Sequence, residues 1–504
     1  MNYVTAPSKI IIVGGGTAGW MTACLMAHQL AQYGTGITLI ESKKIGTVGV
    51  GEGSTPYLKE FFDLLNITEA QWMPACNATY KCGIGFPGWS TEPQYESYFH
   101  PFYSDLDGPL AKQFFDLCNA RRTGGNVYAH PDDFFVASAL VQQNKAPVSE
   151  AISPNKLMYA YHFDAELLGQ FLRCHALQLG VHHIDEKVTD VSKNAEGNIA
   201  LLQTQNSGQL RGDFFVDCSG FSGLLIQKTL GEKLVSYKKH LFNNSAVAIQ
   251  TPLELDKPLS SYTVSKALSC GWVWQIPLAN RYGNGYVYSS DYLDKEQAEQ
   301  ELRDVLGPAA QGQKALHLHW QPGRIEQHWK RNCLAIGLSQ GFLEPLEAPM
   351  LFVVQKSIER FIELFTQCNF SDQKQDDYNK EINAMIDGTR DYLQAHYKLN
   401  SRQDTQYWRD NRDNPALSDT LRSILDKWFD GGNLDLVLHQ NMHKLAYLKT
   451  SWYCLLAGKG RFTNTLKQPK TNLTNQSVAA KLEIAKITAS FHDHKQYLQQ
   501  LFAP

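Results

Sequence analysis

The chain opens with the pattern of a buried strand, a glycine-rich turn, a helix and a second buried strand. Residues 9–13 are a short, mostly β-branched apolar run, and a cluster of glycines follows directly. Residues 21–32 have the composition of a helix, and residues 37–40 form another short apolar run. A strand, a helix and a strand in this order predict a βαβ unit and the beginning of a parallel sheet.

Three later segments extend the same layered module. Residues 214–218 and 334–337 are short apolar runs that predict buried strands, and residues 171–179 predict a helix that ends at Gly180. We therefore predict an α/β fold with a Rossmann-like dinucleotide-binding module.

The character of the sequence changes after about residue 370. Polar, helix-forming sequence dominates from residue 378 to 396 and again from 479 to 502. We therefore predict a dinucleotide-binding module at residues 1–370, with an interleaved sheet region for the substrate. A mainly helical region at residues 371–504 is expected to contribute to the substrate site.

The glycine turn has the order of residues that a dinucleotide site requires. Gly14 permits a tight turn, Gly16 lets the backbone approach a pyrophosphate, and Gly19 lets the helix pack on the strand. The helix that follows presents free N–H groups to the phosphates. Glu41 ends the second strand, where a carboxylate accepts hydrogen bonds from a ribose diol. The predicted cofactor contacts in this unit are Gly14, Gly16, Thr17, Ala18, Gly19 and Glu41.

Composition narrows the class of protein. The 504 residues carry a net charge of −3 and no long basic run, which argues against a nucleic-acid partner. The first residues lack the apolar core of a signal peptide and no apolar run could span a bilayer, so we expect a cytoplasmic protein without membrane contact. The ten cysteines include no CxxC pair, so we expect reduced, mostly buried thiols and no metal site.

Four segments resemble one family, the flavin-dependent tryptophan halogenases. Residues 48–56 (VGVGEGSTP) resemble the segment that forms a strap between the flavin and substrate sites of that family. Residues 80–86 (YKCGIGF) and 341–347 (GFLEPLE) resemble the segments that carry its catalytic lysine and glutamate. Residues 271–277 (GWVWQIP) match the WxWxIP signature that separates these halogenases from related monooxygenases. The likeness covers most of residues 9–360 and becomes weaker beyond them.

The resemblance implies an activity and its cofactors. In this family, reduced FAD supplied by a separate flavin reductase reacts with dioxygen and oxidises a chloride or bromide ion to hypohalous acid. That small oxidant travels through the protein and halogenates an electron-rich, indole-like ring. The implied fold is an FAD-binding module of the flavin monooxygenase type, and a homodimer is compatible with it.

The family motifs also suggest which side chains act. Lys81 would place the halogen against one ring carbon, and Glu347 would stabilise the charge on the ring and accept the displaced proton. Glu344 is a rival for the second role, and we prefer Glu347 from its position in the motif. The resemblance assigns the aromatic substrate to His100, Phe102 and Trp452, further cofactor contacts to Gly51, Asp217 and Gly337, and the halide to Pro349 and Met350.

The chain departs from the family pattern in two places. Family members that bind free tryptophan hold its charged end with a carboxylate shortly before the C-terminal tryptophan, but residues 440–451 contain no acid. A substituted indole, a phenol, a peptide or a carrier-bound ring therefore fits the sequence as well as tryptophan does. Pro349 is the second departure, because proline has no N–H to donate to the halide.

Two alternative functions remain open from the sequence. An FAD-dependent aromatic hydroxylase would use the same reduced flavin and dioxygen. Pro349 favours this alternative, whereas the WxWxIP motif and Lys81 argue against it. A non-catalytic flavin-binding protein is an alternative of a different class.

Overall fold

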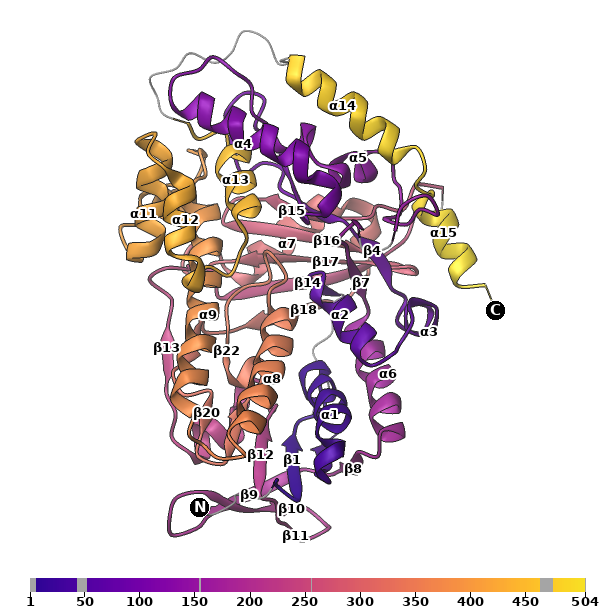
Figure 1. Cartoon of the computed structure of the whole chain (residues 1–504), viewed down its shortest axis with the longest axis vertical. Helices are drawn as coiled ribbons and strands as arrows, with labels where there is room; N and C mark the ends of the chain where they lie inside the picture. The colour runs from indigo at the N-terminus through magenta and orange to yellow at the C-terminus, as the bar shows by residue number, and fades with distance from the viewer. Residues whose placement is uncertain (1–5, 43–51, 154–155, 255, 463–474, 504) are drawn as a thin grey trace.

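The computed structural model arranges the chain as two main sheets with helices around them. A seven-stranded sheet crosses the middle of the molecule, and a six-stranded sheet lies below it in Figure 1. The structure describes residues 6–42, 52–153, 156–254, 256–462 and 475–503.

The six-stranded sheet is built on the predicted βαβ unit. β1 (Lys9–Val13) lies between β2 (Gly36–Glu41) and β12 (Phe214–Asp217) and pairs in parallel with both, which confirms the predicted parallel sheet. Alternate side chains of β1 enter two apolar cores, Ile10 and Ile12 on one face and Ile11 on the other. The other members are β8 (His182–Asp185), β20 (Trp329–Lys330) and β21 (Cys333–Ala335), with α1 (Thr17–Leu30) and α6 (Ala165–Gln178) packed side by side on the sheet.

Gly285 allows the seven-stranded sheet to hold its tryptophans. The WxWxIP segment forms a strand that ends at Pro277, with Trp272 and Trp274 buried. A Cβ atom at Gly285 on the neighbouring strand would lie 2.1 Å from the Trp274 ring, so only glycine lets this indole lie against the sheet. In spatial order the strands are β18 (Ala315–His319), β14 (Ser245–Pro252), β17 (Arg281–Tyr288), β16 (Gly271–Pro277), β15 (Thr263–Ala267), β5 (Gly83–Gly85) and β6 (Phe99–Pro101).

Three small sheets complete the strands. The first consists of β3 (Glu52–Gly53), β7 (Ala160–Phe163) and β4 (Thr79–Lys81), which place the family's lysine motif beside the strap segment. The others are β9 (Val188–Lys193), β10 (Ile199–Thr204) and β11 (Gln209–Leu210), and β13 (Leu234–Ser236), β19 (Gly323–Ile325) and β22 (Gly341–Phe342).

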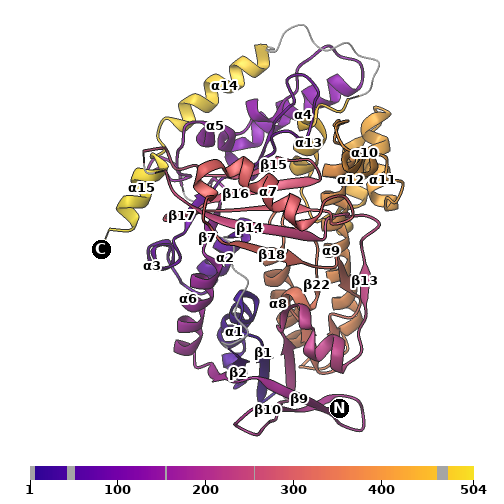
Figure 2. The ribbon, with the colours of Figure 1, turned by 180° about the vertical axis from the view of Figure 1, so that it is seen from behind.

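After β22 the described residues form helices and no strand. Figure 2 shows α14 and α15 along one side of the molecule, beside the N-terminal half. His494 there accepts a hydrogen bond of 3.2 Å from the Tyr80 N–H, so the end of the chain supports β4. The helices are α8 (Met350–Gln367), α9 (Gln375–Lys398), α10 (Gln406–Asp413), α11 (Asp419–Phe429), α12 (Leu434–Gln440), α13 (Lys449–Gly458), α14 (Asn475–Thr488) and α15 (His494–Leu501), and earlier in the chain α2 (Tyr57–Leu64), α3 (Glu69–Trp72), α4 (Gly108–Arg122), α5 (Val136–Gln142) and α7 (Lys295–Leu306).

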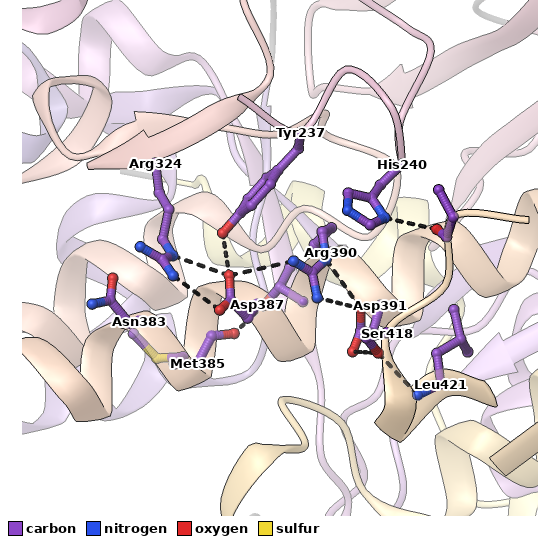
Figure 3. A network of polar contacts seen from close by, with 12 residues as sticks. Tyr237, His240, Arg324, Asn383, Met385, Asp387, Arg390, Asp391, Ser418 and Leu421 are labelled. Carbon is purple, nitrogen blue, oxygen red and sulfur yellow. Dashed lines mark hydrogen bonds and ion pairs between the residues drawn. The ribbon is translucent and has the colours of Figure 1, made fainter. Parts of the chain in front are cut away.

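A polar network holds the middle of α9 in place (Figure 3). Arg324 on β19 forms two hydrogen bonds of 3.0 Å to the Asp387 carboxylate, which also accepts a hydrogen bond from Tyr237. One turn later, Asp391 accepts hydrogen bonds from Arg390 at 2.7 Å and from Ser418 at 2.6 Å. Such paired geometry fixes the rotation of the helix, and hence the direction of the side chains on its opposite face.

Several predicted boundaries differ from the structure. α1 begins at Thr17, four residues before the predicted start. Gly16 is its N-cap residue with an extended backbone, and the helix follows it directly. β21 ends at Ala335, and Gly337 begins a short 3₁₀ turn. The helix-forming stretch at 479–502 contains two helices, α14 and α15.

Two further expectations concern the state of the cysteines and contact with a membrane. All ten cysteines are free thiols; Cys174 is exposed, Cys368 is half-buried and the rest are buried. In the described ranges, no helix is long and apolar enough to cross a membrane.

Candidate active site

The glycine turn after β1 is shaped for a phosphate group. Gly14 has φ +111°, and a Cβ there would lie 2.1 Å from the Cys218 carbonyl oxygen. A Cβ at Gly19 would lie 1.9 Å from the Gly14 oxygen, so α1 can approach the turn only with glycine at this position. The first hydrogen bond of α1 runs from Trp20 N–H to Gly16 O, which leaves the preceding amides at the helix N-terminus for a ligand. No side chain caps Gly16, so the residues present fit the pyrophosphate of a dinucleotide.

The other predicted cofactor residues that the structure describes each make their own contacts within the protein. Glu41 ends β2 and lies against Gly15, and one of its oxygens is 3.1 Å from His183 Nε2. Gly337 has φ +76°, and its missing Cβ makes room for Ala18 at the start of α1. Both oxygens of Asp217 accept hydrogen bonds from the chain, from Ser219 at 2.6 Å and from the Leu225 and Ile226 N–H groups at 2.7 and 2.8 Å. Gly51 lies outside the described residues.

Lys81 is the fully buried end of β4. Its Nζ donates a hydrogen bond of 2.9 Å to the Ser54 carbonyl oxygen and lies 5.6 Å from the centre of the Phe102 ring. Ser54 belongs to the strap segment, so that segment touches the amine directly. Burial lowers the pKa of Lys81 from its usual 10.5 to about 8, and the negative charge of Glu347 opposes part of the change.

A carboxylate on the other side of β4 anchors this strand. Glu69 accepts hydrogen bonds from three phenols, from Tyr80 and Tyr161 at 2.6 Å and from Tyr159 at 2.8 Å. Adjacent residues of a strand point to opposite faces, so Tyr80 faces the tyrosines around Glu69 and Lys81 faces Ser54 and Phe102. The lysine is therefore carried by a strand with a rigid support.

Glu347 lies between two histidines in the loop before α8. His100 Nδ1 is 3.0 Å and His396 Nε2 is 2.8 Å from the same carboxylate oxygen, and all three side chains are buried. Burial alone would raise the pKa of Glu347, but His100 beside it and the hydrogen bonds from both rings hold it at about 2. Glu347 is therefore ionised although it is buried.

Glu344 is committed to a separate network. Its oxygens accept hydrogen bonds from the Tyr397 hydroxyl at 2.5 Å and from the Asn243 amide at 2.8 Å. Burial raises the pKa of Glu344 to about 7. The geometry thus favours Glu347 over Glu344 as the carboxylate that acts with Lys81.

Aromatic side chains close the space around Glu347. Trp452 on α13 meets Tyr392 on α9 edge to face, with 5.0 Å between ring centres, and Tyr392 stacks on Tyr447 at 3.8 Å. The Tyr392 ring lies 6.0 Å from that of His100. These contacts connect residues predicted from distant segments into one cluster rich in aromatic rings: Lys81 with Phe102, Glu347 with His100, and both His100 and Trp452 with Tyr392.

The loop that carries Glu347 ends in an unusual turn. Ala348 has φ +52°, a left-handed conformation that side chains other than glycine seldom adopt. The helix α8 begins at Met350, so Pro349 is its N-cap residue. The Met350 N–H lies ahead of the first hydrogen bond of this helix, from Val353 to Pro349 O, so it is an amide that could donate to an anion.

Sequence reasoning missed three side chains of this region. His396 and Tyr392 are one turn apart on α9 and contact Glu347 and His100, respectively, but a lone histidine in a helix gives no signal by itself. Lys459, directly after α13, is fully buried against Phe86, Trp89 and Tyr98. A lysine between two glycines is typical of an exposed turn and gives no reason to expect a buried cation.

Comparison with known proteins shows what the whole chain is similar to. The family model for tryptophan halogenase matches residues 9–474. The chain is 37% identical over 519 residues to 7-chloro-L-tryptophan 6-halogenase KtzR of Kutzneria sp. (strain 744), covering 98% of this chain and 99% of that protein. Identity to tryptophan 7-halogenase RebH of Lentzea aerocolonigenes is 34%, covering 90% and 89%. The solved structure of Tar14, a tryptophan C-6 flavin-dependent halogenase (chlorinase) from taromycin biosynthesis, matches with TM-score 0.85 and 34% identity, covering 98% of this chain and 100% of that one.

Proposed function

The chain belongs to the tryptophan halogenase family, and from this premise we propose which side chains carry the reaction and which aromatic ring they act on. It is a flavin-dependent halogenating enzyme, and its relatives do not favour the hydroxylase or the non-catalytic flavoprotein. Our proposal is that Lys81 and Glu347 halogenate an uncharged, indole-like ring. The observation that carries it is a buried amine 5.6 Å from the Phe102 ring and a buried, ionised carboxylate that contacts His100 on the same short segment of the chain.

The glycine turn and the start of α8 serve the first half of the reaction. The N–H groups at the start of α1 would hold the pyrophosphate of FAD, and Glu41 at the end of β2 would hold its ribose. Bound there in its reduced form, as delivered by a flavin reductase, FAD would supply with dioxygen the oxidising power for converting a halide to hypohalous acid. The Met350 N–H donates to the halide, while Pro349 offers no donor beside it.

Lys81 places the halogen. With a pKa of about 8, about one amine in ten is neutral at pH 7 and the rest are charged. The charged form donates a hydrogen bond to hypohalous acid, and the neutral form reacts with it to give a haloamine and water. In either form the buried amine directs the halogen to one position on the ring.

Glu347 completes the substitution. Its carboxylate stabilises the positive charge that develops on the ring and then takes the proton from the carbon that has gained the halogen. His100 and His396 hold the carboxylate in its ionised form, so it is ready to accept this proton.

The pocket suits an aromatic ring without an ammonium group. Trp452, Tyr392 and Phe102 provide ring faces and edges for an indole or a phenol. Asp435 is the nearest acid in sequence before Trp452, and it already accepts hydrogen bonds from Tyr453 at 2.8 Å and Lys449 at 2.5 Å. An amino-acid ammonium group would therefore lose its hydration without gaining a partner.

Product analysis tests this proposal. The protein is incubated with FAD, NADH, a flavin reductase and chloride or bromide, with indole, phenol, tryptophan and an indole-containing peptide as separate substrates. Halide-dependent formation of a halogenated ring that is lost in Lys81→Met supports the proposal. Hydroxylated product, or no product with any ring, contradicts it. The protein alone with FAD is expected to oxidise NADH slowly, because it contains one dinucleotide motif.

A further inference from the structure

The Lys81 side chain reaches across the small sheet that carries it. In this sheet β7 lies between β3 and β4, and residues directly opposite each other on neighbouring strands share a face. Ala160 on β7 lies opposite Lys81, and two residues further along the same face His162 lies opposite Gly53 of β3. The lysine amine donates its 2.9 Å hydrogen bond to the carbonyl oxygen of Ser54, directly after β3. The side chain therefore crosses β7 and ends beside β3.

Gly53 leaves the space that the end of this side chain occupies. A Cβ atom at Gly53 would lie 3.6 Å from Lys81 Cδ, which is an ordinary contact distance between carbon atoms. The same Cβ atom would lie only 3.2 Å from Lys81 Nζ, which is closer than side chains normally approach. A methyl group at this position would therefore require the amine to move by a few tenths of an ångström.

His162 blocks the side on which such a methyl group could move away from the amine. The Cβ atom would already lie 3.5 Å from His162 Cδ2. Thr79 gives its only hydroxyl hydrogen to the Pro277 carbonyl oxygen, at 2.6 Å, so His162 Nδ1–H donates to the Thr79 hydroxyl at 3.1 Å. His162 Nε2 then accepts a hydrogen bond of 2.8 Å from the Thr263 hydroxyl. The buried ring is thus held at both nitrogens, and the Lys81 amine is the group that must yield.

The acceptor of the amine is held equally firmly. Ser54 is fully buried, and its N–H donates a 2.9 Å hydrogen bond to the Tyr161 carbonyl oxygen. Its hydroxyl oxygen accepts a 3.1 Å hydrogen bond from the Tyr161 N–H. The amine therefore lies between an acceptor at a fixed place and a glycine that sets how closely the side chain can approach β3.

We propose that Gly53 is a positioning residue whose missing side chain sets where the Lys81 amine lies, and thereby which carbon of the ring receives the halogen. The inference rests on the proposed role of Lys81 as the group that places the halogen. A displaced amine delivers the halogen from a displaced point, so the carbons of the ring are no longer reached with the same preference. Gly53 itself touches neither the ring nor the halogen in this scheme.

The products that Gly53→Ala forms from phenol test the inference, because the ortho and para carbons of phenol both react with an electrophilic halogen. We expect the ratio of ortho to para product to change by about twofold or more, since the two carbons lie at different distances from the amine. We expect kcat to fall about three- to fivefold with KM within about twofold, because a misplacement of about 1 Å costs about a hundredfold in rate. Indole, which has reactive carbons on both of its rings, serves as the second substrate.

Gly169→Ala is the matched control. Gly169 lies on α6, and a Cβ atom there would meet no atom within 4 Å beyond the neighbouring backbone of its own helix. This substitution adds the same methyl group far from the amine, so it should leave kcat and the product ratio at their wild-type values.

Urea unfolding provides a second readout that needs no turnover. Alanine fits the extended backbone of β3, so Gly53→Ala should fold, and it is compared in the wild type and in Lys81→Ala. If the added methyl group meets the amine, the substitution should be tolerated better in Lys81→Ala, with a more favourable change in the unfolding midpoint. Equal changes in the two backgrounds overturn the contact and with it the inference.

The outcomes separate this inference from the proposed function. A wild-type product ratio in Gly53→Ala overturns the role of Gly53 even if kcat falls, because a merely structural change slows both reactions alike. Near-normal halogenation by Lys81→Met would instead overturn the proposed role of Lys81, whatever Gly53→Ala does.

Discussion

Replacement of Lys81 by methionine should abolish halogenation and stabilise the protein at neutral pH. The side chain is fully buried, and its pKa falls from 10.5 to about 8 on folding. A lysine with a lowered pKa binds fewer protons in the folded protein than in the unfolded chain, between about pH 8 and 10.5. The free energy of unfolding of the wild type therefore contains a penalty that is largest below pH 8 and disappears as the pH rises through this window.

The size of the penalty follows from the same two pKa values. It amounts to about 3 kcal/mol at pH 7 and about 1.4 kcal/mol at pH 9.5. Methionine removes it, but leaves the Ser54 carbonyl oxygen without the hydrogen bond from Nζ, which costs about 1–3 kcal/mol at every pH. The advantage of Lys81→Met over the wild type should thus shrink by about 2 kcal/mol between pH 7 and 9.5, whatever the constant cost.

Urea unfolding at the two pH values measures this difference. Wild type, Lys81→Met and a control, Lys112→Met, are compared, because 77% of the Lys112 side chain is exposed. The control should show no dependence of its relative stability on pH in this range. If the difference between Lys81→Met and the wild type is the same at both pH values, or grows with pH, the amine is not held in the buried state described here. Halogenation by Lys81→Met at a near-normal rate would contradict its catalytic role.

Three further predictions concern the carboxylate, the substrate and the halide. Glu347→Gln should slow halogenation by about two to four orders of magnitude, as expected for a positioned acid–base group; a comparable loss in Glu344→Gln with little loss in Glu347→Gln would transfer the role to Glu344. Bare indole should have a higher kcat/KM than free tryptophan, and the reverse order would show that the pocket holds an ammonium group after all. Wild-type protein should prefer bromide to chloride, and Pro349→Thr should improve the affinity for chloride by about one to two orders of magnitude, the value of one charge-assisted hydrogen bond. An unchanged halide preference in a folded Pro349→Thr protein would refute the argument from the missing N–H.

The parts that could be predicted from the sequence are those set by local pattern. The glycine turn could be predicted because Gly14 and Gly19 allow close approaches that other residues would block. The strand of Trp272 and Trp274 and the helix after Pro349 could likewise be predicted from short runs of residues. The start of α1 could not be predicted as closely, since the helix begins four residues before the start that its composition indicates.

The surroundings of Glu347 could not be predicted in the same way. Its partners His100 and His396 lie 247 and 49 residues away in sequence, and they meet because β6 and α9 both pack against the loop before α8. Glu344 and Glu347 are three residues apart with similar neighbours, yet one joins Tyr397 and Asn243 and the other joins the histidines. The burial of Lys459 could not be predicted either, because a lysine between two glycines is typical of an exposed turn.

The support beneath β4 bears on how this enzyme could be redesigned. Glu69 and its three tyrosines hold Tyr80, and through the strand they fix the neighbouring Lys81. With Lys81 as the proposed donor, the halogen arrives from a fixed direction, and the carbon that receives it depends on how the ring is turned. Libraries intended to change regioselectivity should therefore vary the residues that hold the ring, such as Phe102 and Trp452, and leave the strand and its tyrosines intact.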